Sequence, residues 1–392
     1  MLKAGFSVIL SAALVLTSLP ASAADAIRIG YISTLSSPTS TAGPDMLESF
    51  KLGLAEFGGK LAGREVQLIV NDDQMKPDVG VQVARKMLDE NKVQLITGIV
   101  LSNVMLAVAR TVLPRKVVIL SLNAGPSPLA GTECNQNFFA ASYQSDTVAE
   151  GAGIYLQKTG VKSVSLMAPN YVAGRDIMTG FKRYYKGTIA TETYTPLDQF
   201  DFAAELAEIR AANPAATFYF YTSGAPSTNF VKQYAEAGLK GKIPLYGVAM
   251  ALDELTLPGM GEAAYGIKDS TFWTADMKIP ASQAFVAHFE ATYHHRPSIF
   301  AALAYDGLRM LEAALRTVHG DIENSEAFRN ALMSAKFDSV RGHFKFNTNH
   351  FPIQDLHLAR VEKDASGKPV NDYDELIERD HQDAYAAQCK MP

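Results

Sequence analysis

The feature that most constrains this chain is a regular alternation of apolar runs with amphipathic segments, which occurs twice. The first unit predicts strands at 27–32, 66–71, 93–99 and 117–120, and helices at 45–57, 79–91 and 104–113. The second predicts strands at 161–167, 188–194, 217–221 and 243–246, and helices at 146–158, 175–185, 203–212 and 228–237. Apolar strands separated by helices are typical of a parallel sheet covered on both faces. The sequence therefore predicts an α/β fold with two doubly wound parallel-sheet lobes.

The remaining third does not form another unit of this kind. It predicts helices at 279–293, 300–317 and 325–334 that return to cover the first sheet, and a strand at 354–361. Extended stretches at 138–142, 266–274 and 345–351 are candidates for crossings between the lobes. The expected division is lobe 1 at 24–140 plus 272–347, lobe 2 at 141–271 plus 348–363, and a polar C-terminal tail at 364–392.

The first 23 residues have the pattern of a secretory signal peptide. Lys3 precedes an apolar stretch at 6–19, and the small residues Ala21 and Ala23 mark a cleavage site after Ala23. A membrane anchor is the alternative, but the stretch is shorter than the roughly 20 residues that span a bilayer. The sequence therefore predicts an exported protein with its signal at 1–23.

The charge balance gives no reason to expect a nucleic-acid partner. The chain has 36 Lys and Arg against 41 Asp and Glu, a net charge of −5 that becomes more negative once Lys3 is removed. Nucleic-acid and anionic-membrane partners instead favour basic surfaces. The two cysteines, Cys134 and Cys389, are expected to form a disulfide in an oxidising compartment, with two free thiols as the alternative.

Small polar residues follow the predicted strands at the same position in both units. The segments are STLSSPTSTAGPD, GIVLSNVML, SLNAGPSP, APNYVAGRD, YTSGAPSTN and YGVAMALDE. Ligands of doubly wound sheets bind outside the carboxyl ends of the strands, where helix N-termini offer free N–H groups. Simple helix capping is the alternative for any one of these residues. The candidate ligand-binding residues are Ser40, Thr41, Ser102, Asn103, Asn123, Ala124, Asn170, Tyr171, Gly174, Ser223, Gly224, Ala249, Met250 and, from an expected crossing, Trp273.

Signatures of catalysis, metals and cofactors are missing from the sequence. There is no G-x-S-x-G, S-x-x-K, H-E-x-x-H or phosphate-loop motif. His294 and His295 are adjacent and would not face one another on a helix, while Asp72 and Asp73 precede a helix start and fit capping better than metal ligation. We expect no enzyme activity, no metal and no cofactor.

Several stretches together resemble the periplasmic binding proteins of ABC importers, of the leucine/isoleucine/valine-binding type. They are IRIGYISTLSSPTSTAGPDM, QLITGIVLSNVMLAVA, NYVAGRD and YDGLRMLEAAL. The resemblance covers nearly the whole mature chain. It implies a periplasmic, monomeric receptor with a three-crossing hinge that closes on one small molecule and docks on membrane permease subunits. A ligand sensor of the same fold that feeds a membrane receptor or regulator is the alternative.

The resemblance also suggests which residues would hold the ligand. Amino-acid binders of this type hold a carboxylate with loops that match Ser102 and Asn103, and Asn123 and Ala124, in this sequence. The acidic residue that normally holds the ammonium is replaced by Ala249, and Asp253 could reach in only if the loop differs. A buried ammonium without a partner is costly. With Tyr171, Met250, Trp273 and Phe300 as expected neighbours, an aromatic carboxylate is favoured over a branched-chain amino acid.

Overall fold

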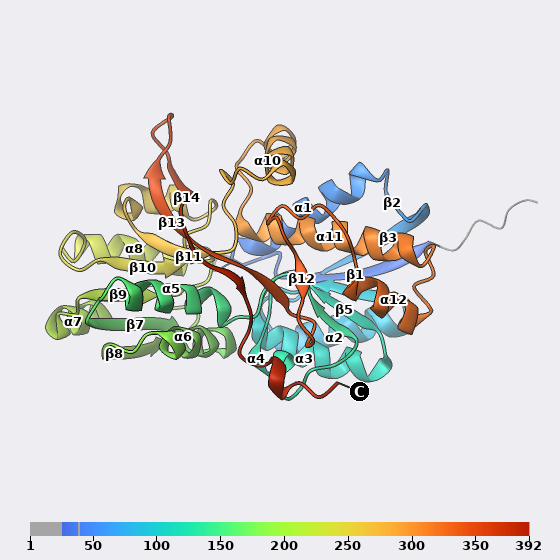
Figure 1. Ribbon diagram of the computed structural model, residues 1–392, viewed down its shortest axis with the longest axis horizontal. Helices are drawn as coiled ribbons and strands as arrows, with labels where there is room; N and C mark the ends of the chain where they lie inside the picture. The colour runs from blue at the N-terminus through green and yellow to red at the C-terminus, as the bar shows by residue number, and fades with distance from the viewer. Residues whose placement is uncertain (1–25, 38–39, 392) are drawn as a thin grey trace, which may run out of the picture.

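The computed structural model describes residues 26–37 and 40–391, arranged as two α/β lobes side by side (Figure 1). The predicted signal peptide lies outside the described residues. Each lobe is built on one sheet with helices on its faces, as the alternating sequence pattern predicts. The predicted fold class is therefore confirmed.

Lobe 1 is the part built on the first sheet, whose strand order is β2-β3-β1-β4-β5-β6. All neighbouring strands are parallel except the β2–β3 pair. Its strands are β1 (Ile27–Ser33), β2 (Lys60–Leu61), β3 (Arg64–Asp72), β4 (Leu95–Gly98), β5 (Val118–Ser121) and β6 (Phe138–Ala140). Its helices are α1 (Ala42–Glu56), α2 (Pro77–Asp89), α3 (Ser102–Val112), α4 (Ser127–Ala130), α10 (Pro280–Tyr293), α11 (Ile299–Thr317) and α12 (Ser325–Met333).

Lobe 2 is the part built on the second sheet, with the order β12-β13-β11-β10-β9-β7-β8 and β14 paired to β13. Strands β8, β7, β9, β10 and β11 run parallel, and β13 is antiparallel to its three partners. The strands are β7 (Ser163–Pro169), β8 (Thr188–Thr195), β9 (Ala216–Tyr219), β10 (Leu245–Val248), β11 (Lys268–Thr271), β12 (Lys345–Phe346), β13 (Pro352–Lys363) and β14 (Pro369–His381). The helices are α5 (Thr147–Lys158), α6 (Val172–Tyr184), α7 (Ala203–Ala212), α8 (Ala225–Glu236) and α9 (Leu257–Met260).

The helices that follow lobe 2 in the sequence return to lobe 1, as predicted. Helix α11 lies along α1 on the upper face of the first sheet (Figure 1). The approach is close, because a Cβ added at Gly53 would lie 2.5 Å from a methyl carbon of Leu308. The hydroxyl of Ser49 donates to the carbonyl of Ala301 at 2.7 Å. A glycine and a small serine on α1 thus allow tight helix packing.

The chain passes between the lobes after β6, after β11 and between α12 and β13. The first and third passages are in contact, because the N–H of Ala140 donates to the carbonyl of His350 at 3.0 Å. Strand β11 of lobe 2 occupies the middle of the stretch expected as the second crossing, and the passage follows this strand. Strand β14 lies within the expected C-terminal tail, so its pairing with β13 makes that segment part of the lobe 2 sheet.

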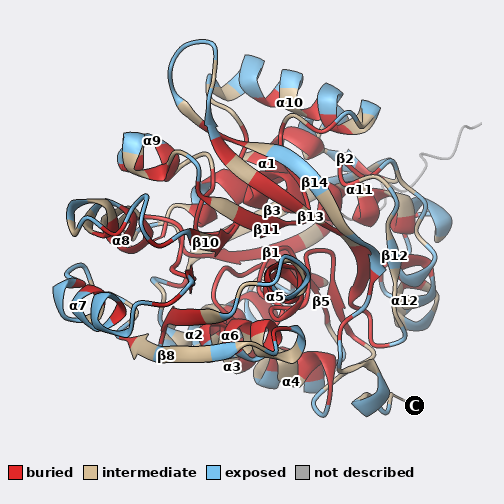
Figure 2. Cartoon of the chain, turned by 60° about the vertical axis from the view of Figure 1, so that its left-hand side comes forward, coloured by how far each residue is buried: buried red, intermediate tan, exposed pale blue. Residues whose placement is uncertain are grey.

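The cores of both lobes consist of the sheet strands and the inner sides of the helices. In Figure 2 the central strands are buried, whereas the edge strands β8 and β14 and the outer faces of α7, α10 and α12 are intermediate or exposed. Helix boundaries follow local chemistry: Pro77 and Pro280 are the first residues of α2 and α10, where a missing N–H costs nothing. Gly238 follows α8 with φ of +67°, the left-handed conformation that glycine allows.

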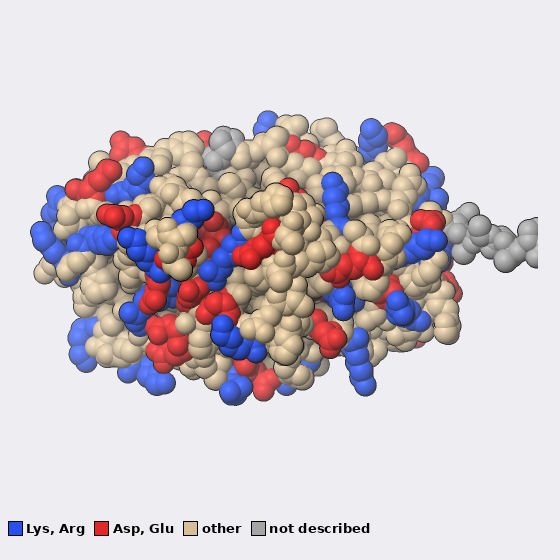
Figure 3. All heavy atoms as spheres, turned by 90° about the horizontal axis from the view of Figure 1, so that it is seen from above, with Lys and Arg blue, Asp and Glu red and all other residues tan. Residues whose placement is uncertain are grey.

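Charges of both signs share the surface. On the face seen in Figure 3, acidic and basic side chains are interspersed over both lobes. Among the described residues, no helix has the length and apolar character needed to cross a membrane.

Candidate functional site

A cavity lies between the two lobes, at the carboxyl ends of their parallel strands. The empty space between the side chains, counted out into the solvent at its opening, is about 450 Å³. Lobe 1 contributes the segments after β1, β4 and β5, and lobe 2 those after β7, β9 and β10. The polar loops that the sequence predicts at these strand ends therefore face one another across the gap.

Half of the predicted site residues line this cavity. Those at its wall are Ser40, Ser102, Asn123, Ala124, Tyr171, Ser223 and Met250, together with Phe300. The predicted residues outside the wall are Thr41, Asn103, Asn170, Gly174, Gly224, Ala249 and Trp273. The lining residues that the sequence analysis did not select are Ala42, Val100, Leu101, Tyr143, Ser145, Ala173, Ile177, Phe220 and Thr222.

Some predicted residues outside the wall have other partners. Trp273 donates its indole N–H to the hydroxyl of Ser282 at 2.8 Å and, with Ala249, borders a separate small cavity. The amide oxygen of Asn170 accepts two N–H groups of Arg175, at 2.7 and 3.0 Å. These contacts direct the two side chains away from the main cavity.

The wall in lobe 1 is formed at the start of α3. The chain reaches it through Gly98, whose φ is +96° and where a Cβ would meet the carbonyl oxygen of Ile32 at 2.3 Å. Glycine is thus required for the turn that brings Ser102, the first residue of α3, to the cavity. The first N–H groups of a helix have no partners within it and carry partial positive charge. This end of the cavity suits a negatively charged group.

A fixed polar chain borders the same end. The Tyr143 hydroxyl donates to the side-chain oxygen of Asn123 at 3.0 Å, and the amide nitrogen of Asn123 donates to the carbonyl of Val100 at 2.7 Å. These two bonds orient the Asn123 amide, leaving one of its N–H groups for another acceptor. The hydroxyl of Ser145 is also fixed, because it donates to the carbonyl of Gly125 at 2.9 Å.

Four aromatic side chains surround the cavity: Tyr143, Tyr171, Phe220 and Phe300. The rings of Tyr171 and Phe220 are nearly parallel, with centroids 6.3 Å apart and planes inclined by 23°. Phe220 directly follows β9, within the run TFYFY that reads from sequence as core. The signal that could have selected it is its position one residue beyond the strand end, where side chains face the ligand edge of the sheet.

The described residues of the cavity wall include no Asp, Glu, Lys, Arg or His. Asp253, the residue that could have replaced the missing acid, lies outside the wall and accepts the N–H of Leu255 at 2.7 Å. Its burial raises the pKa of this carboxyl to about 7. A ligand ammonium would therefore meet no carboxylate at the wall.

Thr41 and Ser223 join the lobes beside the cavity. The Thr41 N–H donates to the carbonyl of Ser223 at 3.2 Å, and their hydroxyl oxygens are 2.6 Å apart. Thr41 belongs to the segment after β1, and Ser223 to the segment before α8. The hydroxyl-rich loop after the first strand thus supplies Ser40 to the cavity and Thr41 to the contact between lobes.

One group of described side chains could in principle hold a metal ion: Asp45, Glu48 and His295, whose ligand atoms lie within 4.8 Å of one another. Nε2 of His295 is 3.8 Å from Asp45 and 3.7 Å from Glu48. Asp45 also accepts the N–H of Ser298 at 3.2 Å, so contacts within the protein account for the arrangement. We therefore assign no metal to it.

The sequence as a whole was then compared with known proteins. A family model described as "Periplasmic binding protein" matches residues 26–368. The chain belongs to this family. A curated relative, Leu/Ile/Val-binding protein homolog 6 from Brucella melitensis, is 25% identical over 369 residues, covering 92% of this chain and 94% of the relative. The family places the protein in the periplasm and among solute-binding proteins.

Two solved structures from Rhodopseudomonas palustris share this architecture closely. One is an ABC transporter solute-binding protein in complex with benzoate, with 28% identity, a TM-score of 0.87 and coverage of 93% of this chain and 99% of the other. The second is in complex with 3,4-dihydroxybenzoic acid, with 26% identity, a TM-score of 0.84 and coverage of 92% and 99%. Both are solute-binding proteins of ABC transporters, so the chain has the fold of that class.

Proposed function

We propose that this protein binds an aromatic carboxylate in the cavity between its lobes and delivers it to the permease of an ABC importer. The observation that carries the proposal is the wall of the cavity, which combines four aromatic rings with uncharged polar groups and a helix N-terminus. Both similar structures described above hold benzoic acids. Their ligands support the same chemical class for this chain.

The wall offers distinct environments for the two parts of such a ligand. The carboxylate would lie at the start of α3, where Ser102 and the first N–H groups of the helix donate to it. The ring would lie among the aromatic side chains, where offset or edge-to-face contacts add about 0.5–1.5 kcal/mol each beyond area burial. A leucine-like ligand would carry an ammonium into a wall that lacks an acidic partner.

A ligand screen tests this proposal directly. Selective binding raises the melting temperature, so we expect benzoate and 4-hydroxybenzoate to raise it by several degrees at concentrations well above Kd. Benzamide tests the need for the carboxylate, and phenylalanine tests the cost of the ammonium. We expect little effect from either or from leucine. A melting temperature raised by leucine or isoleucine but unchanged by the benzoates would contradict the proposal.

Replacing Ser102 with alanine is expected to weaken binding of the preferred aromatic acid about tenfold. The change removes one hydrogen bond to a charged group, which is worth roughly 1.5–3 kcal/mol. Titration calorimetry measures the effect. Ser227→Ala is the matched control, because that buried serine donates to the carbonyl of Ala251 at 2.7 Å and lies outside the cavity wall. Equal affinities of the two variants would remove Ser102 from the site.

A further inference from the structure

We propose that Asp176 is a positioning residue whose contact with Ser127 latches helix α6, a part of the cavity wall, onto the opposite lobe. The proposal rests on the proposed function, because it concerns closure of that same cavity. Asp176 belongs to α6 in lobe 2, and Ser127 is the first residue of α4 in lobe 1. Neither residue lines the cavity.

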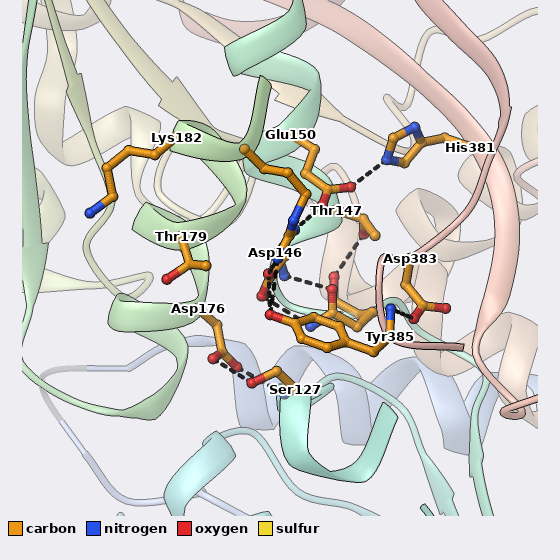
Figure 4. Close-up of polar contacts among 12 residues, drawn as sticks. Ser127, Asp146, Thr147, Glu150, Asp176, Thr179, Lys182, His381, Asp383 and Tyr385 are labelled. Atoms are coloured by element: carbon orange, nitrogen blue, oxygen red, sulfur yellow. Dashed lines mark hydrogen bonds and ion pairs between the residues drawn. The ribbon is translucent and has the colours of Figure 1, made fainter. Parts of the chain in front are cut away.

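The contact is bidentate. The N–H of Ser127 donates to one carboxylate oxygen of Asp176 at 2.9 Å, and its hydroxyl donates to the other at 2.7 Å (Figure 4). Both partners are only partly exposed. Two charge-assisted bonds to one carboxylate fix direction as well as distance, so they set how α6 lies against lobe 1.

Helix α6 is the element through which this contact reaches the cavity. Tyr171 immediately precedes the helix, and Ala173 and Ile177 lie on it, all three at the cavity wall. Ile177 is next to Asp176 in the sequence. A latch at Asp176 therefore holds one side of the wall at its closed position without touching the ligand.

The C-terminal end of α6 is held by the last segment of the chain. Arg183 donates to a carboxylate oxygen of Asp146 at 2.8 Å and to the hydroxyl of Tyr385 at 3.1 Å. The Tyr385 hydroxyl donates to the same oxygen of Asp146 at 2.7 Å (Figure 4). Arg183 also pairs with Glu150. Asp146 and Glu150 are fully buried. This end of α6 is therefore anchored to the C-terminal segment.

The same C-terminal segment is bound to the neighbourhood of Ser127. A disulfide joins Cys389 to Cys134, which follows α4 in lobe 1. The side chain of Asn349 adds polar bonds to the carbonyl of Ala130 at 2.9 Å and to Asp383 at 3.0 Å. The two partners of the latch therefore belong to elements held by the same C-terminal segment, α4 next to the disulfide and α6 through hydrogen bonds of Arg183, which raises the effective concentration of one near the other.

Loss of the latch should lower the population of the closed form. Apparent affinity falls in proportion to the fraction of protein in the binding-competent state, and such changes fall mainly on the dissociation rate. We expect Asp176→Ala to weaken aromatic-acid binding about tenfold through faster dissociation. Ser127→Ala keeps the N–H bond, so its effect should be about threefold.

Calorimetry and stopped-flow dissociation with benzoate test this on the intact, oxidised protein. Thr179→Ala is the matched control, because Thr179 lies on the same helix and its hydroxyl donates to the carbonyl of Arg175 within α6. The affinity and dissociation rate of this control should stay within twofold of those of the unmodified protein. The double variant of Asp176 and Ser127 should have the affinity and dissociation rate of Asp176→Ala alone, since the two substitutions remove the same contact. Additive losses in the double variant would overturn the latch.

A second measurement does not depend on the ligand. Small-angle scattering of the ligand-free proteins should give a larger radius of gyration for Asp176→Ala than for Thr179→Ala. Equal scattering together with equal dissociation rates would overturn the proposal. If the unmodified protein binds none of the aromatic acids, the proposed function fails, but the scattering comparison still tests the latch. In that case equal radii of gyration for the two variants are enough to overturn the latch.

Discussion

Replacing Arg341 with methionine is expected to lower the free energy of unfolding by about 3–5 kcal/mol, the usual cost of removing one partner of a buried ion pair. Nε of Arg341 donates to a carboxylate oxygen of Asp306 at 2.9 Å, and Asp306 is fully buried. The substitution leaves that charge in the protein interior without its cation. The hydroxyl of Ser339 and the N–H of Val340 also donate to Asp306, but neither carries a charge.

Arg341 also holds the first and third passages between the lobes. Its guanidinium donates to the carbonyl of Ser142 at 2.7 Å, to the carbonyl of Ala141, and to the side-chain oxygen of Gln354 at 2.8 Å. Buried acceptors that lose a donor each cost about 1–3 kcal/mol. The expected loss therefore combines an unpaired carboxylate with unsatisfied backbone groups at the hinge.

Urea unfolding measures this loss as a lower midpoint with an unchanged m-value. Arg110→Met is the matched control, because Arg110 on α3 pairs with Glu133 at 3.0 Å and the two side chains are 65% and 41% exposed. An exposed pair of this kind contributes about 0–1 kcal/mol. A loss below 1 kcal/mol for Arg341→Met, or one equal to the control, would show that the buried network does not stabilise the hinge.

The fold could be predicted because apolar residues recur with different periods in strands and in helices, and because the alternation of strands and helices occurs twice along the chain. Helix α7 occupies the predicted residues, and α5, α10 and α11 begin within one residue of the predicted starts. The alternation of apolar residues did not predict strand β14. Its residues alternate poorly and are largely exposed, because this strand lies at the sheet edge and pairs only with β13. A strand that pairs with one neighbour and is exposed to solvent buries few side chains, so its sequence shows little apolar alternation.

Sequence reasoning reached residues of the cavity wall where their position depends on the backbone, and it missed residues whose position depends on side-chain direction. Ser102 and Asn123 follow strand ends, and topology alone brings strand ends together. Phe220 and Trp273 could not be distinguished by composition, since both are aromatic residues near strand ends. The structure separates them: Phe220 faces the cavity, whereas Trp273 binds Ser282. Thr41 similarly contacts the opposite lobe instead of the cavity wall.

Replacing both Cys134 and Cys389 with serine is expected to lower the free energy of unfolding by about 2–5 kcal/mol. The two residues are 255 positions apart with Cα atoms 5.6 Å apart, so the bridge closes more than half of the chain into a loop. In the chain-entropy account, closing a long loop restricts the unfolded chain more than closing a short one. The bridge also fixes the segment after β14, where Tyr385 contacts Asp146.

Thermal and urea unfolding of the oxidised protein and the double serine variant measure this effect. The control is the unmodified protein unfolded with a reductant present, which should reproduce the stability of the variant if the bridge alone is responsible. Thiol titration in denaturant should find no reactive group before reduction and two after it. Two reactive thiols in the untreated exported protein would contradict the bridge. Equal stability with and without reductant would instead show that non-covalent contacts of the C-terminal segment, such as those of Asn349 with Ala130 and Asp383, suffice to hold it.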